Sequence, residues 1–294
     1  MKSEKTIKFG RLIILLVILL INISCKKSPT EPVESTPPGR RDYVWTADTI
    51  FVPSSRISHM WGPSPTDIWA ISPPYDYDSA IFHYDGSKWK VVKTNVPINA
   101  ETIYGFGAND IWIGTSDGFL IHYDGSTWHR NTSVQTYDGK YISWECIWGE
   151  SANDVYAVGA YLDSNKLFNN GVIAHYNGIA WQFLSGINKP NTSGQIYKSP
   201  NDGSYYLSAT RWGGTLVDST YILKFDGKSL KTIYSGTYGT SKYCALAMLG
   251  NDLYYIIGRN LCTYDGNNFN AFMTFENADL SVYFKLCKWQ GLQL

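Results

Sequence analysis

This chain has no formal net charge, few arginine residues and none of three common catalytic motifs. The 25 Lys and Arg residues balance 25 Asp and Glu residues, so the formal net charge is zero. A balanced chain without a basic stripe argues against nucleic acid or an anionic surface as the main partner. The nucleophile-elbow, P-loop and zinc-protease signatures, Gly-x-Ser-x-Gly, Gly-x-x-x-x-Gly-Lys-Ser/Thr and His-Glu-x-x-His, are also missing. The sequence therefore offers no recognisable active-site motif.

Cysteine is rare, with five in the chain. The four that follow Cys25 show neither Cys-x-x-Cys nor His-paired spacing, so we expect no metal site and no cofactor. They lie in strand-like runs, which favours buried free thiols, and a single disulfide is the alternative in an exported protein. These residues are Cys146, Cys244, Cys262 and Cys287.

The chain has one long apolar run, near its start. Basic residues precede ten apolar residues from Leu12 to Ile21. At 1.5 Å per residue the run covers roughly 15 Å, half of a ~30 Å hydrocarbon core, which favours a secretory signal over a membrane-spanning helix.

Ser24-Cys25 at the end of this run resembles a bacterial lipobox, although Asn22 stands where that pattern has Leu. The resemblance implies that residues 1–24 are a lipoprotein signal peptide and that Cys25 carries acyl chains. Such chains would anchor the protein stably to the cell envelope, with the outer membrane expected. An ordinary cleaved signal is the alternative.

Residues 25–41 contain no aromatic side chain and carry Pro29, Pro32, Pro37 and Pro38. This composition cannot bury a core and favours extended conformations, so it predicts a tether. Residues 42–294 are then expected to form one all-β domain.

A repeated unit is the most informative feature of that domain. Its clearest copies read Trp61-Gly-Pro-Ser-Pro-Thr-Asp67, followed by His83-Tyr-Asp-Gly-Ser-Lys-Trp89, and Trp148-Gly-Glu-Ser-Ala-Asn-Asp154, followed by His175-Tyr-Asn-Gly-Ile-Ala-Trp181. Five copies align on a first-turn Asp, with separations of 43, 44, 48 and 50 residues: Asp67, Asp110, Asp154, Asp202 and Asp252. They align again on a second turn: Asp85, Asp124, Asn177, Asp226 and Asp265.

Each copy contains four short runs rich in aromatic and β-branched residues, which in the first copy are 57–61, 67–71, 80–84 and 89–94. Periods of this length with four strands each predict a β-propeller of four-stranded antiparallel blades. Asp-Gly or Asn-Gly in the second turn favours a hairpin whose Gly has positive φ. In the first turn, Asx side chains are expected to bond backbone N–H groups. We interpret both Asp sets as structural.

The aromatic residues after the first turn are expected to pack between neighbouring blades: Trp69, Trp112, Tyr156, Tyr206 and Tyr255. The recurring His83, His122 and His175 are interpreted as packing or turn-bonding residues. Copies four and five are degenerate, since Leu230 and Phe269 replace Trp and Tyr197-Lys-Ser replaces the Trp-Gly pair.

Five blades are recognisable, and residues 278–294 supply only part of a sixth. The run Val44–Ile50 resembles a fourth strand without its first three, so it is expected to complete the last blade and close the ring. Either the sixth blade is irregular or the chain is shortened, and the second interpretation is slightly favoured.

These blocks resemble those of bacterial surface and exported proteins with kelch-like or sialidase-like propellers. The resemblance covers residues 56–276 and implies a fold, but no single activity. Sialidases carry a related Asp-box turn and a three-Arg clamp. Here the turn from Asp85 to Trp89 is one residue shorter, and only four Arg follow Arg41.

The loops between second and third strands vary in length and are expected to crowd one face of the propeller, and loops on a rigid scaffold are where binding residues usually lie. Aromatic, Asp and Asn side chains there suit glycan hydroxyls and rings, and equally suit a protein surface. The expected ligand-binding residues are Tyr75, Asp76, Tyr77, Asp78, Tyr161, Asp163, Asn165, Arg211 and Trp212. Solvated loops with aromatics lying back on the disc are the structural alternative.

We therefore predict a non-enzymatic, lipid-anchored binding module for glycans or envelope proteins. A carbohydrate-active enzyme with a site at the ring centre and a structural subunit of an envelope complex are the alternatives.

Overall fold

The computed structural model describes residues 50, 57–72, 81–162, 164, 167, 170–184, 192–212, 217–237, 244–249 and 252–275. Contacts divide the chain into residues 1–49 and 50–294, and every described residue belongs to the second part. In these ranges all regular structure is β, and none forms a helix of the length and hydrophobicity needed to cross a bilayer. The predicted signal peptide, Cys25, the tether, residues 44–49 of the closing strand and the partial sixth blade lie outside the described residues.

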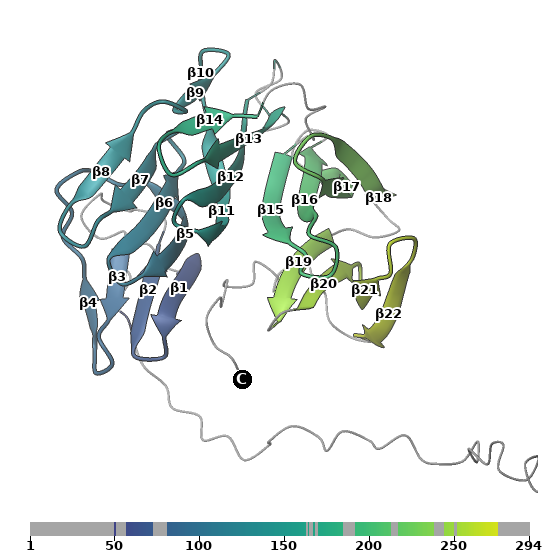
Figure 1. Ribbon diagram of the computed structural model, residues 1–294, viewed down its shortest axis with the longest axis horizontal. Helices are drawn as coiled ribbons and strands as arrows, with labels where there is room; N and C mark the ends of the chain where they lie inside the picture. The colour runs from purple at the N-terminus through teal and green to yellow at the C-terminus, as the bar shows by residue number, and fades with distance from the viewer. Residues whose placement is uncertain are drawn as a thin grey trace, which may run out of the picture. The chain divides into compact units, whose positions relative to one another are not determined.

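Five four-stranded antiparallel sheets and one two-stranded hairpin make up the described part of the chain (Figure 1). Each four-stranded sheet, called a blade below, pairs its strands in chain order. Blade 1 contains β1 (His59–Ser64), β2 (Asp67–Ile71), β3 (Ile81–Tyr84) and β4 (Trp89–Val91). Blade 2 contains β5 (Ala100–Gly107), β6 (Asp110–Thr115), β7 (Leu120–Tyr123) and β8 (Trp128–Asn131).

The short hairpin of β9 (Thr136–Tyr137) and β10 (Lys140–Tyr141) follows blade 2. Blade 3 contains β11 (Ser143–Ser151), β12 (Asp154–Tyr161), β13 (Asn170–Tyr176) and β14 (Trp181–Phe183). Blade 4 contains β15 (Thr192–Lys198), β16 (Tyr205–Trp212), β17 (Val217–Phe225) and β18 (Leu230–Thr237). Blade 5 contains β19 (Cys244–Leu249), β20 (Asp252–Ile257), β21 (Asn260–Tyr264) and β22 (Phe269–Thr274).

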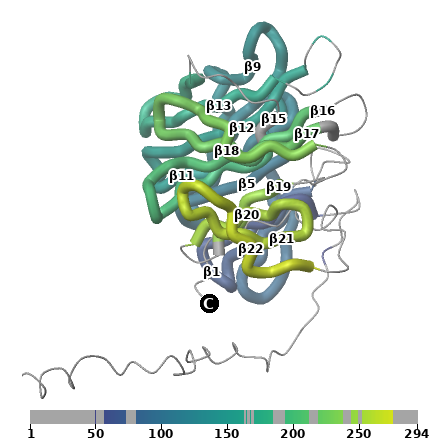
Figure 2. Tube along the Cα trace, turned by 90° about the vertical axis from the view of Figure 1, so that its right-hand side faces the viewer, coloured from purple at the N-terminus to yellow at the C-terminus, as the bar shows by residue number. Residues whose placement is uncertain are grey.

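This architecture confirms the predicted all-β fold of four-stranded antiparallel blades. The first strands of successive blades contact one another, β1 with β5, β5 with β11, β11 with β15 and β15 with β19. Figure 2 shows the last such pair of blades side by side, blade 4 in green and blade 5 in yellow.

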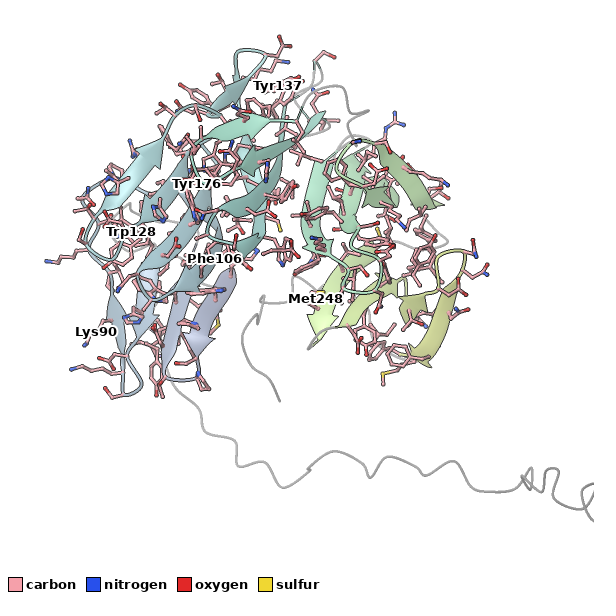
Figure 3. The ribbon with its side chains drawn as sticks, in the orientation of Figure 1. Lys90, Phe106, Trp128, Tyr137, Tyr176 and Met248 are labelled. Atoms are coloured by element: carbon pink, nitrogen blue, oxygen red, sulfur yellow. The ribbon has the colours of Figure 1, made fainter. Side chains whose placement is uncertain are left out.

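Aromatic side chains join the blades at every described junction, as predicted. On the second strand of each of blades 1 to 4, one aromatic ring is met by two rings of the next blade. Trp69 is met by Tyr123 and Trp128, at centroid distances of 5.7 and 6.2 Å. The same arrangement recurs as Trp112 with Tyr176 and Trp181, Tyr156 with Tyr205 and Phe225, and Tyr206 with Tyr255 and Tyr264. Two of these covering residues, Trp128 and Tyr176, are labelled in Figure 3.

Tyr255 therefore packs between blades, but not from the side that its alignment with Trp69 implies. It covers the preceding blade, whereas Trp69, Trp112, Tyr156 and Tyr206 receive the following one. A shift of one residue along a strand exchanges its two faces, and the repeat copy in blade 5 shows that shift.

The first and third turns of a blade lie on one face, as strand alternation predicts. An ideal Cβ on Gly125 of the β7–β8 turn would stand 2.7 Å from Asn109 of the β5–β6 turn. Gly178 approaches Asn153 in the same way, at 2.9 Å. The loops between second and third strands consequently leave the blades on the opposite face, which we call the variable-loop face.

Candidate functional site

Three His–Asp pairs are the most conspicuous acid–base groups of the described chain. His83 Nε2 lies 2.7 Å from Asp67 Oδ1, and the equivalent pairs are His122 with Asp110 at 2.7 Å and His175 with Asp154 at 2.6 Å. A carboxylate oxygen can only accept, so each ring nitrogen donates. The pairs recur at the same place in three successive blades. Such repetition indicates scaffolding, in agreement with the packing role predicted for these histidines.

Each of these imidazoles also stacks on the aromatic ring of the neighbouring strand. The centroid distances are 4.3 Å for Trp69–His83, 4.4 Å for Trp112–His122 and 4.4 Å for Tyr156–His175. Hydrogen bonding on one nitrogen and stacking on the ring hold the imidazole between β-strands. In blade 4 Lys224 replaces the histidine and its Nζ lies 2.7 Å from Asp202 Oδ2.

Three of the first-turn carboxylates, Asp67, Asp110 and Asp154, bond a histidine of the third strand and not the turn N–H groups that were expected. In blade 4 the expectation is confirmed, because Asp202 Oδ1 accepts from Ser204 N at 3.0 Å. In blades 1, 3 and 4 a serine hydroxyl at the start of the turn also accepts from a turn N–H, as when Asn201 N donates to Ser199 Oγ at 3.3 Å. Serine occupies the start of the turn, where its short side chain reaches the backbone two residues on. Asp67, Asp110 and Asp154 are the first residues of their second strands, and their side chains reach a histidine on the third strand.

The second-turn Asx residues behave as predicted in all five blades. Asp226 Oδ1 accepts from Lys228 N at 2.9 Å and from Ser229 N at 2.7 Å. Asn177 makes the same pair of bonds at 3.0 Å each, so the amide oxygen replaces the carboxylate without loss of geometry. Equivalent bonds occur at Asp85, Asp124 and Asp265. The following Gly always has positive φ, between 85° and 98°.

These bonds favour the ionised form of the second-turn carboxylates. Backbone N–H donation, led by Ser229, lowers the pKa of Asp226 to about 2. The pKa of Asp124 is lowered chiefly by the Thr127 N–H, and that of Asp85 chiefly by the Lys90 ammonium. Charges committed in this way stabilise turns and are not available as general acids at neutral pH.

Of the residues predicted to bind a ligand on the variable-loop face, two have described side chains. Tyr161, at the end of β12, is 9% exposed and stacks on Tyr137 of the β9–β10 hairpin at 5.4 Å. Lys140 Nζ lies 5.7 Å from the same ring and donates to Leu162 O at 3.0 Å. Arg211 is exposed on β16.

The other predicted ligand-binding residues do not have described side chains. Trp212 is the last residue of β16, and the rest lie outside the described residues: Tyr75, Asp76, Tyr77, Asp78, Asp163 and Asn165. The hairpin that covers Tyr161 was not expected, although Asp138-Gly139 is the turn sequence that favours it, with φ of 53° and 70°. The ligand-binding roles of all these residues stay predictions.

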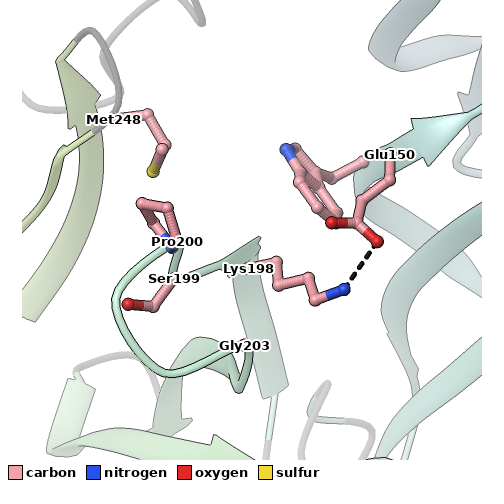
Figure 4. A pocket seen from close by; sticks show the side chains of 7 residues that line it. Glu150, Lys198, Ser199, Pro200, Gly203 and Met248 are labelled. Atoms are coloured by element: carbon pink, nitrogen blue, oxygen red, sulfur yellow. Dashed lines mark hydrogen bonds and ion pairs between the residues drawn. The ribbon is translucent and has the colours of Figure 1, made fainter.

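A pocket of about 400 Å³ lies on the other face, between blades 3, 4 and 5 (Figure 4). Its lining combines an aromatic ring, a thioether, a proline and an ion pair: Trp148, Glu150, Lys198, Ser199, Pro200, Gly203 and Met248. Lys198 Nζ lies 2.6 Å from Glu150 Oε2. The pocket was not predicted from the sequence. The feature that could have indicated it is Tyr197-Lys198, which replaces the Trp-Gly pair of the clearest copies.

The three described cysteines that follow the tether, Cys146, Cys244 and Cys262, are buried thiols, as expected. Burial raises the pKa of the Cys244 thiol to about 11. Within the ranges that the structure describes, no group of three or more His, Cys, Asp and Glu side chains is arranged to hold a metal ion.

Comparison with known proteins supports the fold. The chain superimposes on the structure of YCF48 bound to D1 peptide with a TM-score of 0.51 and 15% identity, covering 76% of this chain and 71% of that one. It superimposes on PorZ, a surface component of the type-IX secretion system of Porphyromonas gingivalis, with a TM-score of 0.50 and 13% identity, covering 70% of this chain and 32% of that one. The fold is therefore β-propeller-like.

A third neighbour is the GH74 xyloglucanase from Xanthomonas campestris, with a TM-score of 0.45, 12% identity and coverage of 67% of this chain and 34% of that one. That similarity is too slight to carry an argument. The chain spans about a third of the length of the xyloglucanase and of PorZ. No family model matches the sequence, and no curated protein matches it.

Proposed function

We propose that this chain is a non-enzymatic binding module of the bacterial cell envelope, which recognises a protein or a glycan through residues outside the repeat. The observation that carries the proposal is that the repeated ionisable side chains already bond or pack within the propeller. The three His–Asp pairs stack on aromatic rings, and the second-turn Asp residues bond backbone N–H groups. What remains for function is therefore the non-repeated surface.

A protein ligand has the better support. YCF48 is described as bound to a peptide, and PorZ as a component of a secretion system at the bacterial surface. A protein of similar fold thus binds a peptide elsewhere, although fold alone does not transfer a function. The non-repeated residues of this chain also include Tyr, Trp and Arg, the residue types that dominate binding hot spots.

Attachment to the envelope is the second part of the proposal. Acylation of Cys25 would anchor the chain, and the Pro-rich residues 26–41 would hold the propeller away from the bilayer. Mass spectrometry of the N-terminal peptide should show acyl chains on Cys25 and none in the variant Cys25→Ser. A cleaved N-terminus without lipid would contradict this part alone.

Binding can be tested with the full-length protein, purified in detergent and applied to a broad glycan array and to an array of synthetic 12-residue peptides. The variant Tyr75→Ala/Tyr77→Ala/Trp212→Ala removes the predicted aromatic residues of the variable-loop face. Ile179→Ala is the matched control, since this side chain is 87% exposed on the opposite face.

Ligands lost in the triple variant and retained in the control would place recognition on the variable-loop face. Mass spectrometry of the array glycans provides a second readout, because cleaved glycans would reveal a carbohydrate-active enzyme. No binding to either array would overturn the proposal in favour of a structural subunit.

A further inference from the structure

The pocket between blades 3, 4 and 5 forms where the repeat is broken. In blades 2 and 3 the residue after the first-strand aromatic is glycine, Gly105 and Gly149, paired with Ile111 and Val155. The same position in the ladder is Lys198 in blade 4, paired with Tyr205, and Met248 in blade 5, paired with Leu253. Lys198 and Met248 both line the pocket.

Glycine at this position allows neighbouring blades to pack closely. A Cβ on Gly105 would stand 2.7 Å from Cη2 of Trp61, and a Cβ on Gly149 would stand 2.8 Å from Cζ of Phe106. In each case a ring of the preceding blade occupies the space above the glycine. Lys198 fills that place with its own side chain, and Trp148 instead meets Tyr205 edge-on at 5.9 Å.

A second substitution replaces the aromatic side chain that packs at the other blade junction. Phe106 of blade 2 packs on Tyr104 at 5.2 Å and touches Gly149 of blade 3. The equivalent residue of blade 3, two positions after its first-strand aromatic, is Glu150. Its carboxylate turns to Lys198, as Figure 4 shows, so this position supplies an ion pair where blade 2 supplies a ring.

The pocket lining therefore combines apolar side chains, Trp148, Pro200 and Met248, with Ser199 and an ion pair. Figure 4 shows Met248 and Pro200 on one side and Glu150 on the other, with Lys198 bridging to Glu150. The side chains of Lys198 and Glu150 are 27% and 46% exposed, so both charges remain accessible to a ligand. A carboxylate accepts from an N–H and an ammonium donates to a C=O, so the pair matches a main-chain amide.

We propose that this pocket binds a peptide segment, taking one apolar side chain between Trp148, Pro200 and Met248 while Glu150 and Lys198 bond the adjacent main chain. The inference rests on the proposed binding function and names its partner as a protein with an exposed apolar residue. A volume of about 400 Å³ suits a single side chain with its flanking backbone. Methionine adapts to varied apolar partners, and tryptophan is enriched in hot spots.

A sugar fits this pocket less well than a peptide does. A sugar ring needs an open aromatic face, whereas Trp148 is 8% exposed and already packs against Tyr205 in a T-shaped pair with centroids 5.9 Å apart. The pocket also lies on the face of the short turns, because Ser199, Pro200 and Gly203 belong to the β15–β16 turn. It is thus separate from the variable-loop face.

The test uses the full-length protein on the 12-residue peptide array, with two pairs of variants. Met248→Asp places a charge in the apolar wall, and its control Met273→Asp alters a methionine that is 47% exposed on β22. Lys198→Ala breaks the pocket ion pair, and its control Lys224→Ala breaks the similar 2.7 Å pair with Asp202. Thermal unfolding of each variant confirms that it is folded.

We expect peptides that contain an apolar residue to bind, with at least tenfold weaker binding in Met248→Asp and Lys198→Ala and less than twofold change in the controls. If both pocket variants still bind peptides but the Tyr75/Tyr77/Trp212 variant does not, the peptide site proposed at the pocket is wrong. The proposed binding function would then still stand. Glycan binding without peptide binding would also overturn the pocket alone. No binding on either array would contradict both the pocket proposal and the proposed function.

Discussion

His122 lies flat against Trp112, with ring centroids 4.4 Å apart and 27° between the planes, while its Nε2 donates to Asp110 at 2.7 Å. Trp112 also meets Trp181 from blade 3, with ring centroids 5.3 Å apart and 81° between the planes. The imidazole therefore fixes the ring that the next blade packs on. A residue type often associated with catalysis is here part of the junction between blades.

Replacing this imidazole should weaken the fold without affecting binding. His122→Ala removes the stack and one hydrogen bond to a carboxylate, so we expect a loss of about 1–3 kcal/mol in the free energy of unfolding. His129→Ala is the matched control, because that side chain is 59% exposed and bonds Asp124 at the surface, where about 0.5 kcal/mol is expected. Urea denaturation measures both. Equal losses in the two variants would contradict the structural role of His122.

Glycine at the blade junction is expected to be irreplaceable where a ring lies over it. The Cβ of Gly105→Ala would meet Trp61 Cη2 at 2.7 Å and Asp110 O at 2.8 Å, and the backbone oxygen cannot rotate away. Overpacking of this kind costs about 1–3 kcal/mol. Gly107→Ala is the control two residues along the same strand, since a Cβ there meets nothing within 4 Å. The melting temperature should fall for Gly105→Ala and stay level or rise for Gly107→Ala.

Stability should decline in acid as the turn carboxylates are protonated. The pKa of Asp226 is lowered from 3.8 to about 2 in the folded protein. A carboxyl group with a depressed folded pKa stabilises the fold above its unfolded pKa and loses that contribution as the pH falls through the folded pKa. The window for Asp226 is therefore about pH 4 to 2.

Asp226→Asn tests this contribution, because an amide oxygen accepts the same two N–H bonds, as Asn177 does in blade 3. The melting temperature of the wild type should exceed that of Asp226→Asn at pH 6, and the difference should shrink between pH 4 and pH 2. A difference that is constant or that grows toward pH 2 would exclude this mechanism.

The buried thiols should be inert in the folded protein. Cys146, Cys244 and Cys262 are buried, and burial raises the pKa of Cys244 to about 11, so at pH 8 its thiolate fraction is roughly one thousandth. Iodoacetamide at pH 8, followed by peptide mapping, should label these three cysteines only after denaturation in guanidinium. Rapid labelling of Cys244 in the native protein would mean that blade 5 opens readily.

Much of the fold could be predicted because its determinants are local. In an Asp-Gly or Asn-Gly turn the glycine takes a positive φ, and the side-chain oxygen of the Asp or Asn accepts from the turn N–H groups. The hairpin can therefore be recognised from the sequence of each repeat, and Gly178 and Gly266 adopt φ of 85° and 98° as expected. Regular spacing of these turns predicts blades of four strands. The aromatic residues at Trp69 and Trp112 follow from the same periodicity, since only a neighbouring blade can bury them.

The sequence by itself thus determined the strand order, the chemistry of the second turns and the aromatic junctions of blades 1 to 4, because each depends on residues close together in the chain or on a constant period. The tertiary structure alone decided that Asp110 bonds His122 rather than its own turn, since that choice depends on cross-strand register. It alone also placed Glu150, Lys198 and Met248 around one pocket. These residues come from three blades and depart from the repeat, so no period in the sequence connects them, and only the packing of blade against blade brings them together.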